Sequence, residues 1–137
     1  MKYIISFLIA IVMISCDNQS SHNYNNNDYY KTKNTLEDQE TANPKHFLEI
    51  DGTWTKNLMG EYVIKGRITN SAKIATYKDV KVKISFYSKT GSLMKTEYAT
   101  VYDYFKSGTS KSYKIKTLGV KRAKEIKWEI EGASPSY

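Results

Sequence analysis

An alternation of apolar and polar residues with a period of two is the feature that most constrains how this chain folds. It is clearest in residues 80–87, where the apolar positions are Val80, Val82, Ile84 and Phe86. Residues 125–131 repeat the pattern, with apolar positions at Ile126, Trp128 and Ile130. Successive side chains of a strand point to opposite faces, so the pattern indicates strands packed on one face and solvated on the other.

Six candidate strands follow one another in the second half of the chain. They cover residues 47–56, 61–69, 77–88, 93–104, 111–118 and 125–132. Turn-forming stretches such as SKTGS and KSGTS separate them, and no ten-residue stretch after residue 46 has a helical stripe. Short strands at this spacing predict an all-β sandwich of six to seven antiparallel strands, formed by a domain at 47–137.

The strand at 93–104 leaves two facings open. Either Leu93, Ala99 and Val101 point inward, or Met94, Tyr98 and Tyr102 do, and a β-bulge could switch between the two. The outcome matters because exposed tyrosines could stack on a sugar or contact a protein. Four tyrosines are candidates for such a patch, and we expect about half of them to lie in the core or in turns: Tyr87, Tyr98, Tyr102 and Tyr104.

Residues 66–115 resemble the FxLYD-type immunoglobulin-like domains of prokaryotic envelope proteins. The matching positions are Gly66, Ile68 and Asn70, then Val80, Val82, Ile84, Phe86 and Tyr87, then Gly91, Gly108 and Tyr113. Ser88 stands where that family often has Asp, and Ser107 where it often has Pro. The resemblance implies an immunoglobulin-like sandwich. It implies no enzyme activity, and it offers no functional residues to carry over.

The N-terminus reads as a targeting segment. Lys2 precedes an apolar run from Tyr3 to Ile14 that only Ser6 interrupts. As a helix, about a dozen residues span about 18 Å, well short of the roughly 30 Å hydrocarbon core of a bilayer. Residues 1–15 are therefore predicted to be a signal peptide rather than a transmembrane helix.

Cys16 is the only cysteine of the chain and follows this segment directly. The sequence Met13-Ile14-Ser15-Cys16 resembles the lipobox of bacterial lipoproteins, although Leu is commoner than Met at the first position. The resemblance implies cleavage before Cys16 and a thioether-linked diacylglycerol on its thiol, often with a palmitate-like acyl chain on the new amino group. The alternatives are an ordinary secretory signal or a buried thiol, but the polar run from Asp17 cannot bury one.

Residues 16–46 are predicted to be the lipidated cysteine followed by a disordered polar tether. The stretch from Asp17 to Lys45 is rich in Asn, Ser, Thr and Asp, and it has no period of 2 or 3.6. Within it, residues 35–42 could form one or two helical turns with Thr35 as N-cap, ended by Pro44, but such a helix is too short to be stable alone.

Positive charge is concentrated in the predicted domain, where residues 47–137 hold seventeen basic and nine acidic residues. The outward positions of four strands would form one basic face if those strands were neighbours. That candidate face comprises Lys65, Arg67, Lys81, Lys83, Lys114 and Lys116, with Lys127 beside them. It could bind an anionic lipid, an acidic glycan or an acidic protein. The alternative is that these lysines only keep the sheets soluble.

The chain has few residues of the types that catalytic and metal-binding sites need. The chain has only two histidines, His22 and His46, and its acidic residues are scattered. We therefore expect no catalytic residues, no metal, no cofactor and no nucleic-acid binding. The sequence predicts a non-enzymatic lipoprotein, anchored outside the cytoplasm on the cell membrane or outer membrane, that binds or scaffolds cell-envelope components. The alternative is a peripheral module whose basic face docks on anionic lipid or polysaccharide. The sequence indicates no oligomeric state.

Overall fold

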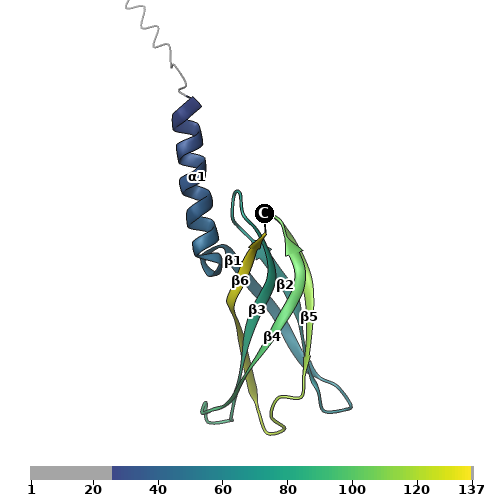
Figure 1. The fold of residues 1–137 in the computed structure, drawn as a ribbon. Helices are drawn as coiled ribbons and strands as arrows, with labels where there is room; N and C mark the ends of the chain where they lie inside the picture. The colour runs from purple at the N-terminus through teal and green to yellow at the C-terminus, as the bar shows by residue number, and fades with distance from the viewer. Residues whose placement is uncertain (1–25, 137) are drawn as a thin grey trace, which may run out of the picture.

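The computed structural model describes residues 26–136 of the chain, so the predicted signal peptide and Cys16 lie outside the described residues. Within this range there are two helices, α1 (Asn26–Ala42) and α2 (Pro44–Phe47), followed by strands (Figure 1). The strands are β1 (Leu48–Lys56), β2 (Tyr62–Asn70), β3 (Thr76–Tyr87), β4 (Leu93–Phe105), β5 (Ser110–Thr117) and β6 (Glu125–Ser136). No helix of this part of the chain is long and apolar enough to cross a membrane.

The strands form two three-stranded antiparallel sheets. Their orders are β1-β2-β5 and β4-β3-β6, so β2 and β3 are the central strands. In an immunoglobulin domain the corresponding orders are A-B-E and C′-C-F. The predicted all-β sandwich of antiparallel strands is confirmed with six strands, and five of them lie within one residue of their predicted bounds at both ends. Strand β6 is longer than predicted and continues to Ser136.

The core lies between the two sheets, where the alternating apolar residues meet. From β3 it receives Val80, Val82, Ile84 and Phe86, each no more than 1% exposed. From β2 it receives Tyr62, Ile64 and Ile68, which lie opposite. Aromatic packing continues across the layer, because the Tyr62 ring lies 5.5 Å from that of Phe86 and 5.7 Å from that of Trp54. Burial of such side chains stabilises the fold by about 1.5–3 kcal/mol each.

The facing of β4 is now settled. Ala99 and Val101 pack against the core, whereas Tyr98 and Tyr102 are exposed. The register against β3 shifts between Lys78 and Val80, which places an extra β4 residue opposite Asp79. Asp79 has a φ of 52° at this irregularity. Strand β4 keeps its alternation through the bulge, since Phe105 faces inward like Ala99 and Val101, whereas β3 changes from inward Tyr77 to inward Val80. Leu93, which the first facing placed inward, is exposed at the start of β4.

The prediction of a disordered tether is wrong for residues 26–46. These residues form α1 and α2, and α1 is far longer than the one or two turns expected at 35–42 (Figure 1). Thr35 is not an N-cap, since its hydroxyl donates to the Lys31 carbonyl within the helix. The first half of α1 is exposed on all sides and projects from the sandwich. The second half of α1 is partly buried, and Glu40 is its fully buried residue.

Glu40 holds the end of α1 on the sandwich. Its side chain is 1% exposed, and its carboxylate accepts hydrogen bonds from backbone N–H groups of Lys73 (2.7 Å), Ile74 (2.9 Å) and Ala75 (2.8 Å). The Tyr77 hydroxyl donates to the Glu40 carbonyl at 2.8 Å. Burial raises the pKa of Glu40, but these hydrogen bonds and the Lys73 charge outweigh it and hold the pKa below its usual range. The folded unit therefore begins before residue 47.

Candidate functional site

The predicted basic residues do not form one face. Lys65, Arg67, Lys114 and Lys116 lie on the outer face of the β1-β2-β5 sheet, whereas Lys81 and Lys83 lie on the outer face of the β4-β3-β6 sheet. These two faces point away from each other across the core. The single basic face expected from the sequence is therefore wrong, because strand order, which alternation does not specify, separates its members.

The larger group of basic residues lies on β2 and β5. Lys65 is directly opposite Lys114 in the register, and Lys116 is opposite Val63. Like charges directly opposite on a sheet are unfavourable, so this pair is retained at a cost. Acidic residues on the neighbouring β1 moderate the charge, since Glu49 and Asp51 are on the same outer face. The Asp51 carboxylate accepts a hydrogen bond from the backbone N–H of Arg67 at 3.1 Å. The face is basic only over β2 and β5.

The outer face of the β4-β3-β6 sheet carries the tyrosines. Tyr98, Tyr102 and Tyr104 come from β4 and are 55%, 82% and 53% exposed, and half-buried Tyr87 comes from β3. None of the four is in the core, so the expectation that about half of them would be core or turn residues is wrong. We call these four residues the tyrosine face. Aromatic side chains in such numbers on one exposed sheet surface are typical of contact surfaces rather than of solubilising ones.

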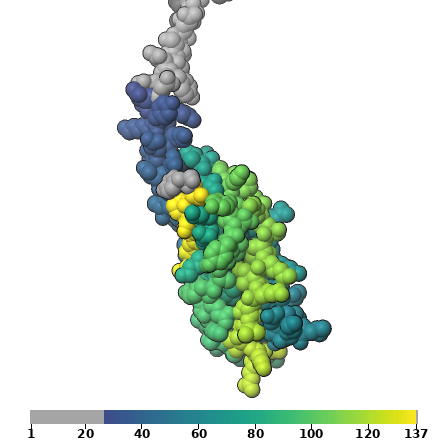
Figure 2. Space-filling view, turned by 45° about the vertical axis from the view of Figure 1, so that its right-hand side comes forward, coloured from purple at the N-terminus to yellow at the C-terminus, as the bar shows by residue number. Residues whose placement is uncertain are grey.

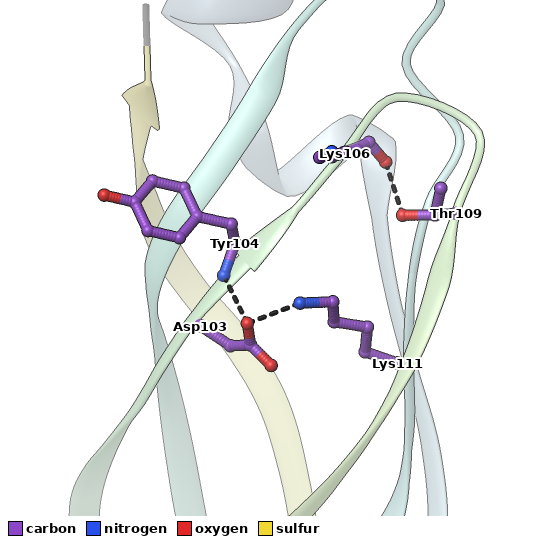
Figure 3. Close-up of polar contacts among 5 residues, drawn as sticks. All are labelled: Asp103, Tyr104, Lys106, Thr109 and Lys111. Atoms are coloured by element: carbon purple, nitrogen blue, oxygen red, sulfur yellow. Dashed lines mark hydrogen bonds and ion pairs between the residues drawn. The ribbon is translucent and has the colours of Figure 1, made fainter.

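The conformation of β4 near its end directs Tyr104 outward. The Asp103 carboxylate bonds the Lys111 ammonium of β5 at 2.5 Å and accepts the Tyr104 N–H at 2.7 Å. Figure 3 shows the Tyr104 ring on the other side of β4 from this ion pair. The turn beyond it is closed by the Thr109 hydroxyl, which donates to the Lys106 carbonyl at 2.8 Å. Asp103 thus links the two sheets and fixes the side from which Tyr104 projects.

Charges on the tyrosine face are balanced by close partners. Lys83 pairs with Glu129 at 2.8 Å and Lys127 with Glu125 at 3.4 Å. The hydrogen bond and charge of Glu129 raise the pKa of Lys83, and Lys83 in turn lowers the pKa of Glu129. The lysines also contact the rings: the ammonium of Lys81 lies 4.8 Å from the centre of the Tyr98 ring. The face is therefore aromatic and near neutral rather than strongly basic.

A shallow hollow of about 270 Å³ adjoins Tyr87 on this face. It is lined by Lys83, Ser85, Tyr87, Lys127, Trp128 and Glu129. Trp128 is half-buried, in contrast to the fully inward position that its alternation predicts, and Lys127 lies 5.2 Å from the Tyr87 ring centre. The hollow combines hydroxyl, indole and charged groups, which are the groups that bind a hydroxylated or peptide-like ligand.

The acidic residues and the histidine of the described chain do not gather into a metal-binding group. Among residues 26–136, no three His, Cys, Asp or Glu side chains are placed to hold a metal ion. His46 lies in α2 and is exposed, while Cys16, the predicted lipidation site, lies outside the described residues. The most unusual carboxylate of the described chain, Glu40, is occupied by backbone N–H groups and has a structural role.

Comparisons with known proteins add one distant likeness. No protein-family model matches the chain, and no curated protein is similar to it in sequence. The crystal structure of Campylobacter jejuni cj0090 matches with a TM-score of 0.41 and 18% identity, over 58% of this chain and 80% of that one. At this score the likeness supports no statement about activity or partners.

Proposed function

We propose that this chain is a lipid-anchored, extracytoplasmic protein whose β-sandwich binds another component of the cell envelope through the tyrosine face. In this proposal Cys16 carries the lipid, the sandwich has no catalytic role, and the anchor lies in the cell membrane or the outer membrane. The observation that carries the binding role is the exposure of three rings on one strand, Tyr98, Tyr102 and Tyr104.

These rings do not stabilise the sandwich to any great extent. Each is more than half exposed, so burial gains only a fraction of what a core tyrosine gains. Exposed patches of this kind mark contact sites, because Tyr supplies large area at a low entropic cost. The near-neutral charge of the face favours a protein or a glycan over a highly charged polymer. We do not propose that a basic sheet face docks on anionic material, because the basic residues predicted for that face lie on two opposite sheet faces.

The tyrosine face is tested by a photo-crosslinking residue placed at Tyr102 in living cells. The matched control is the same residue at Thr53, which is exposed on the outer face of the other sheet. We expect a discrete adduct at Tyr102, absent at Thr53 and weakened at least severalfold by Tyr98→Ser. Mass spectrometry of the adduct identifies a protein or a glycan. Equal adducts at both positions, or none at Tyr102, would show that this face is not the contact.

The anchor is tested separately. Intact mass and membrane fractionation of the wild type are compared with those of Cys16→Ser. We expect a diacylglycerol-modified, membrane-bound wild type and a variant without the lipid mass. A wild-type chain whose mass shows a free Cys16 thiol would overturn the lipoprotein proposal and leave the test of the tyrosine face intact.

A further inference from the structure

Three loops meet at the end of the sandwich opposite α1. They are residues 57–61 between β1 and β2, 88–92 between β3 and β4, and 118–124 between β5 and β6. Figure 1 shows all three at the end far from the helix and from the C-terminus, and in Figure 2 the first and third protrude there. We call these loops, with the flanking Lys56 and Leu93, the distal tip.

Hydrogen bonds hold the loops of the distal tip together as one surface. The loop at 118–124 is central: the Lys56 ammonium donates to the Lys121 carbonyl at 3.3 Å, which joins it to the end of β1. The buried Tyr62 hydroxyl donates to the Val120 carbonyl at 2.6 Å, and the Lys124 N–H donates to the Tyr87 carbonyl at the end of β3 at 2.9 Å. The three loops therefore have defined positions relative to one another.

Four large apolar side chains of the distal tip are exposed. Leu58 is fully exposed, and Met59, Leu118 and Leu93 are 82%, 72% and 58% exposed. The first turn does not need them, because its hydrogen bonds come from Asn57: its carbonyl accepts from Gly60, and its side chain binds Glu61 through both backbone and carboxylate. Polar residues are the usual choice at such positions. Four exposed aliphatic side chains on one convex end thus gain nothing for the fold and are suited to contact an apolar phase.

Cations surround these side chains. Lys56, Lys89, Lys121, Arg122 and Lys124 are all exposed, and the only acidic residue of the tip is Glu61, which Asn57 already binds at 2.7 Å. This balance differs from that of the tyrosine face, where carboxylates neutralise the lysines. Aliphatic residues ringed by Lys and Arg match the interface of an anionic bilayer, in which apolar side chains reach the acyl boundary and cations meet the phosphates.

We propose that the distal tip docks on an anionic lipid bilayer, inserting Leu58, Met59, Leu93 and Leu118 between headgroups. The cations that contact lipid phosphates are Lys89, Lys121, Arg122 and Lys124, since the Lys56 ammonium is held at the Lys121 carbonyl and the Tyr62 ring. The three loops contain no aromatic residue, and aromatic residues are the side chains enriched where folded proteins meet, which favours the bilayer as occupant. This contact is distinct from the tyrosine face and is made at the end of the sandwich opposite α1.

The test uses the full chain carrying Cys16→Ser and Met59→Cys, labelled on the new cysteine with an environment-sensitive fluorophore. Vesicles of phosphatidylcholine alone are compared with vesicles containing about one-third phosphatidylglycerol. The control chain carries the label at Ser112→Cys instead, exposed on the outer face of β5 beside the basic residues of the other sheet. The apolar N-terminal segment is the same in both chains and cannot distinguish the two label positions.

We expect the Met59 label to move to an apolar environment, with a severalfold rise in emission, on anionic vesicles only, and the Ser112 label not to respond. Adding Leu58→Ser and Leu118→Ser to the labelled chain should weaken the response at least tenfold in lipid concentration, since each replaced residue loses its transfer into the interface. Lys121→Gln with Arg122→Gln should weaken it as well and reduce its dependence on salt. These side chains are exposed, so an unchanged circular dichroism spectrum is expected to show that the fold is retained.

Three results would overturn the proposal. A Met59 label that is silent on anionic vesicles at low salt shows that the tip does not insert. A response at Ser112 without one at Met59 shows that the sheet face docks instead. Equal responses of the Met59 label on neutral and anionic vesicles, unaltered by the Lys121 and Arg122 substitutions, show that the cations have no part in the contact.

Discussion

The two ends of the sandwich are stabilised in different ways. At the end next to α1, buried polar groups are saturated with hydrogen bonds: Glu40 accepts three from the loop between β2 and β3, and Asn70 bonds three further backbone groups. At the distal tip the loops present Leu58, Met59 and lysines to solvent. One end is therefore specialised for holding its shape and the other for meeting a partner, and substitutions should separate the two properties.

The largest loss of stability is expected from Glu40→Ala. It leaves three backbone N–H groups without their charged acceptor, and hydrogen bonds to charged groups contribute about 1.5–3 kcal/mol each. We expect a decrease of about 3–4 kcal/mol in the free energy of unfolding by urea, with α1 becoming sensitive to protease. Glu40→Gln keeps one acceptor oxygen, so its free energy of unfolding should decrease by about half as much as that of Glu40→Ala. Equal stability of Glu40→Ala and wild type would mean that the helix is not fastened by this residue.

Asn70→Ala is expected to have the next largest effect. The Asn70 side chain is fully buried; its amide donates to the carbonyls of Ala75 and Phe105, and its oxygen accepts from the Ala72 N–H, all at 2.9 Å. Removing it leaves buried polar groups unsatisfied, which costs about 2–3 kcal/mol in thermal or urea unfolding. The adjacent Thr69→Ala, on the outward face of β2, should change stability by less than about 1 kcal/mol.

Gly119→Ala probes the one tightly packed backbone position of the distal tip. Gly119 has a φ of 49°, and a Cβ there would lie 2.4 Å from the Phe86 ring and 2.8 Å from the Tyr62 ring. The added methyl group must displace core side chains, so we expect a loss of about 2 kcal/mol. Gly60→Ala is the matched control: its φ of 83° is also positive, but no atom lies within 4 Å of the added Cβ. A Gly119→Ala loss no larger than the Gly60→Ala loss would mean that only backbone strain matters.

Acidification should weaken the helix-side end further. The folded-state pKa of Glu40 lies below its usual value of about 4.3, so the unfolded chain binds a proton first. The stability that Glu40 contributes is therefore complete above about pH 5 and is lost as the pH falls through the folded-state pKa. Urea midpoints measured from pH 6 to pH 3 should fall more steeply for the wild type than for Glu40→Gln. Parallel curves would assign the acid sensitivity to other carboxylates whose pKa is lowered. One of these is Glu97, where burial raises the pKa but hydrogen bonds from Lys95 and Thr117 lower it by more.

The smallest effect on stability is expected from Leu58→Ser and Met59→Ser. Both side chains are exposed and make no contribution to the core, so the double variant should unfold within about 0.5 kcal/mol of wild type. If the same variant also loses vesicle binding, Leu58 and Met59 contribute to the bilayer contact and not to the stability of the fold. A loss above about 1 kcal/mol would mean that the tip residues serve the fold after all.

Sequence pattern predicted the strands well because alternation is a local property. Burial of one sheet face accounts for the inward facing of Val80 to Phe86 and of Ile126 to Ile130. The same alternation gives the approximate bounds of these strands. Which sheet holds each strand is not local: Lys65 and Lys81 share an alternation pattern but lie on opposite faces because β2 pairs with β1 and β5. The facing of the β4 tyrosines was ambiguous for a different reason: apolar or aromatic residues stand at both odd and even positions of this strand, so alternation alone does not select one face.

The helix α1 illustrates a second limit. Its sequence is polar and has no apolar stripe, so neither composition nor period indicates that it docks. The contact is made largely by one carboxylate whose partners are backbone N–H groups thirty or more residues away, together with the Tyr77 hydroxyl on the Glu40 carbonyl. A residue-type pattern cannot identify such partners, because any loop could supply them. The distal tip was not predicted either, although Leu58 and Met59 lie between the predicted strands 47–56 and 61–69, where aliphatic residues are unusual.

The Glu40 contact has a mechanical consequence. The loop that it binds, between Asn70 and Thr76, is the first of three crossings from one sheet to the other. Tension applied to the N-terminal end of α1 is thus shared between the covalent path into β1 and a path through the carboxylate into this crossing. A force applied at the N-terminal end of α1 therefore acts on both sheets at once. It does not act on the edge strand β1 alone. Force applied along α1 (residues 26–42) therefore reaches the sandwich in part through the Glu40 side chain.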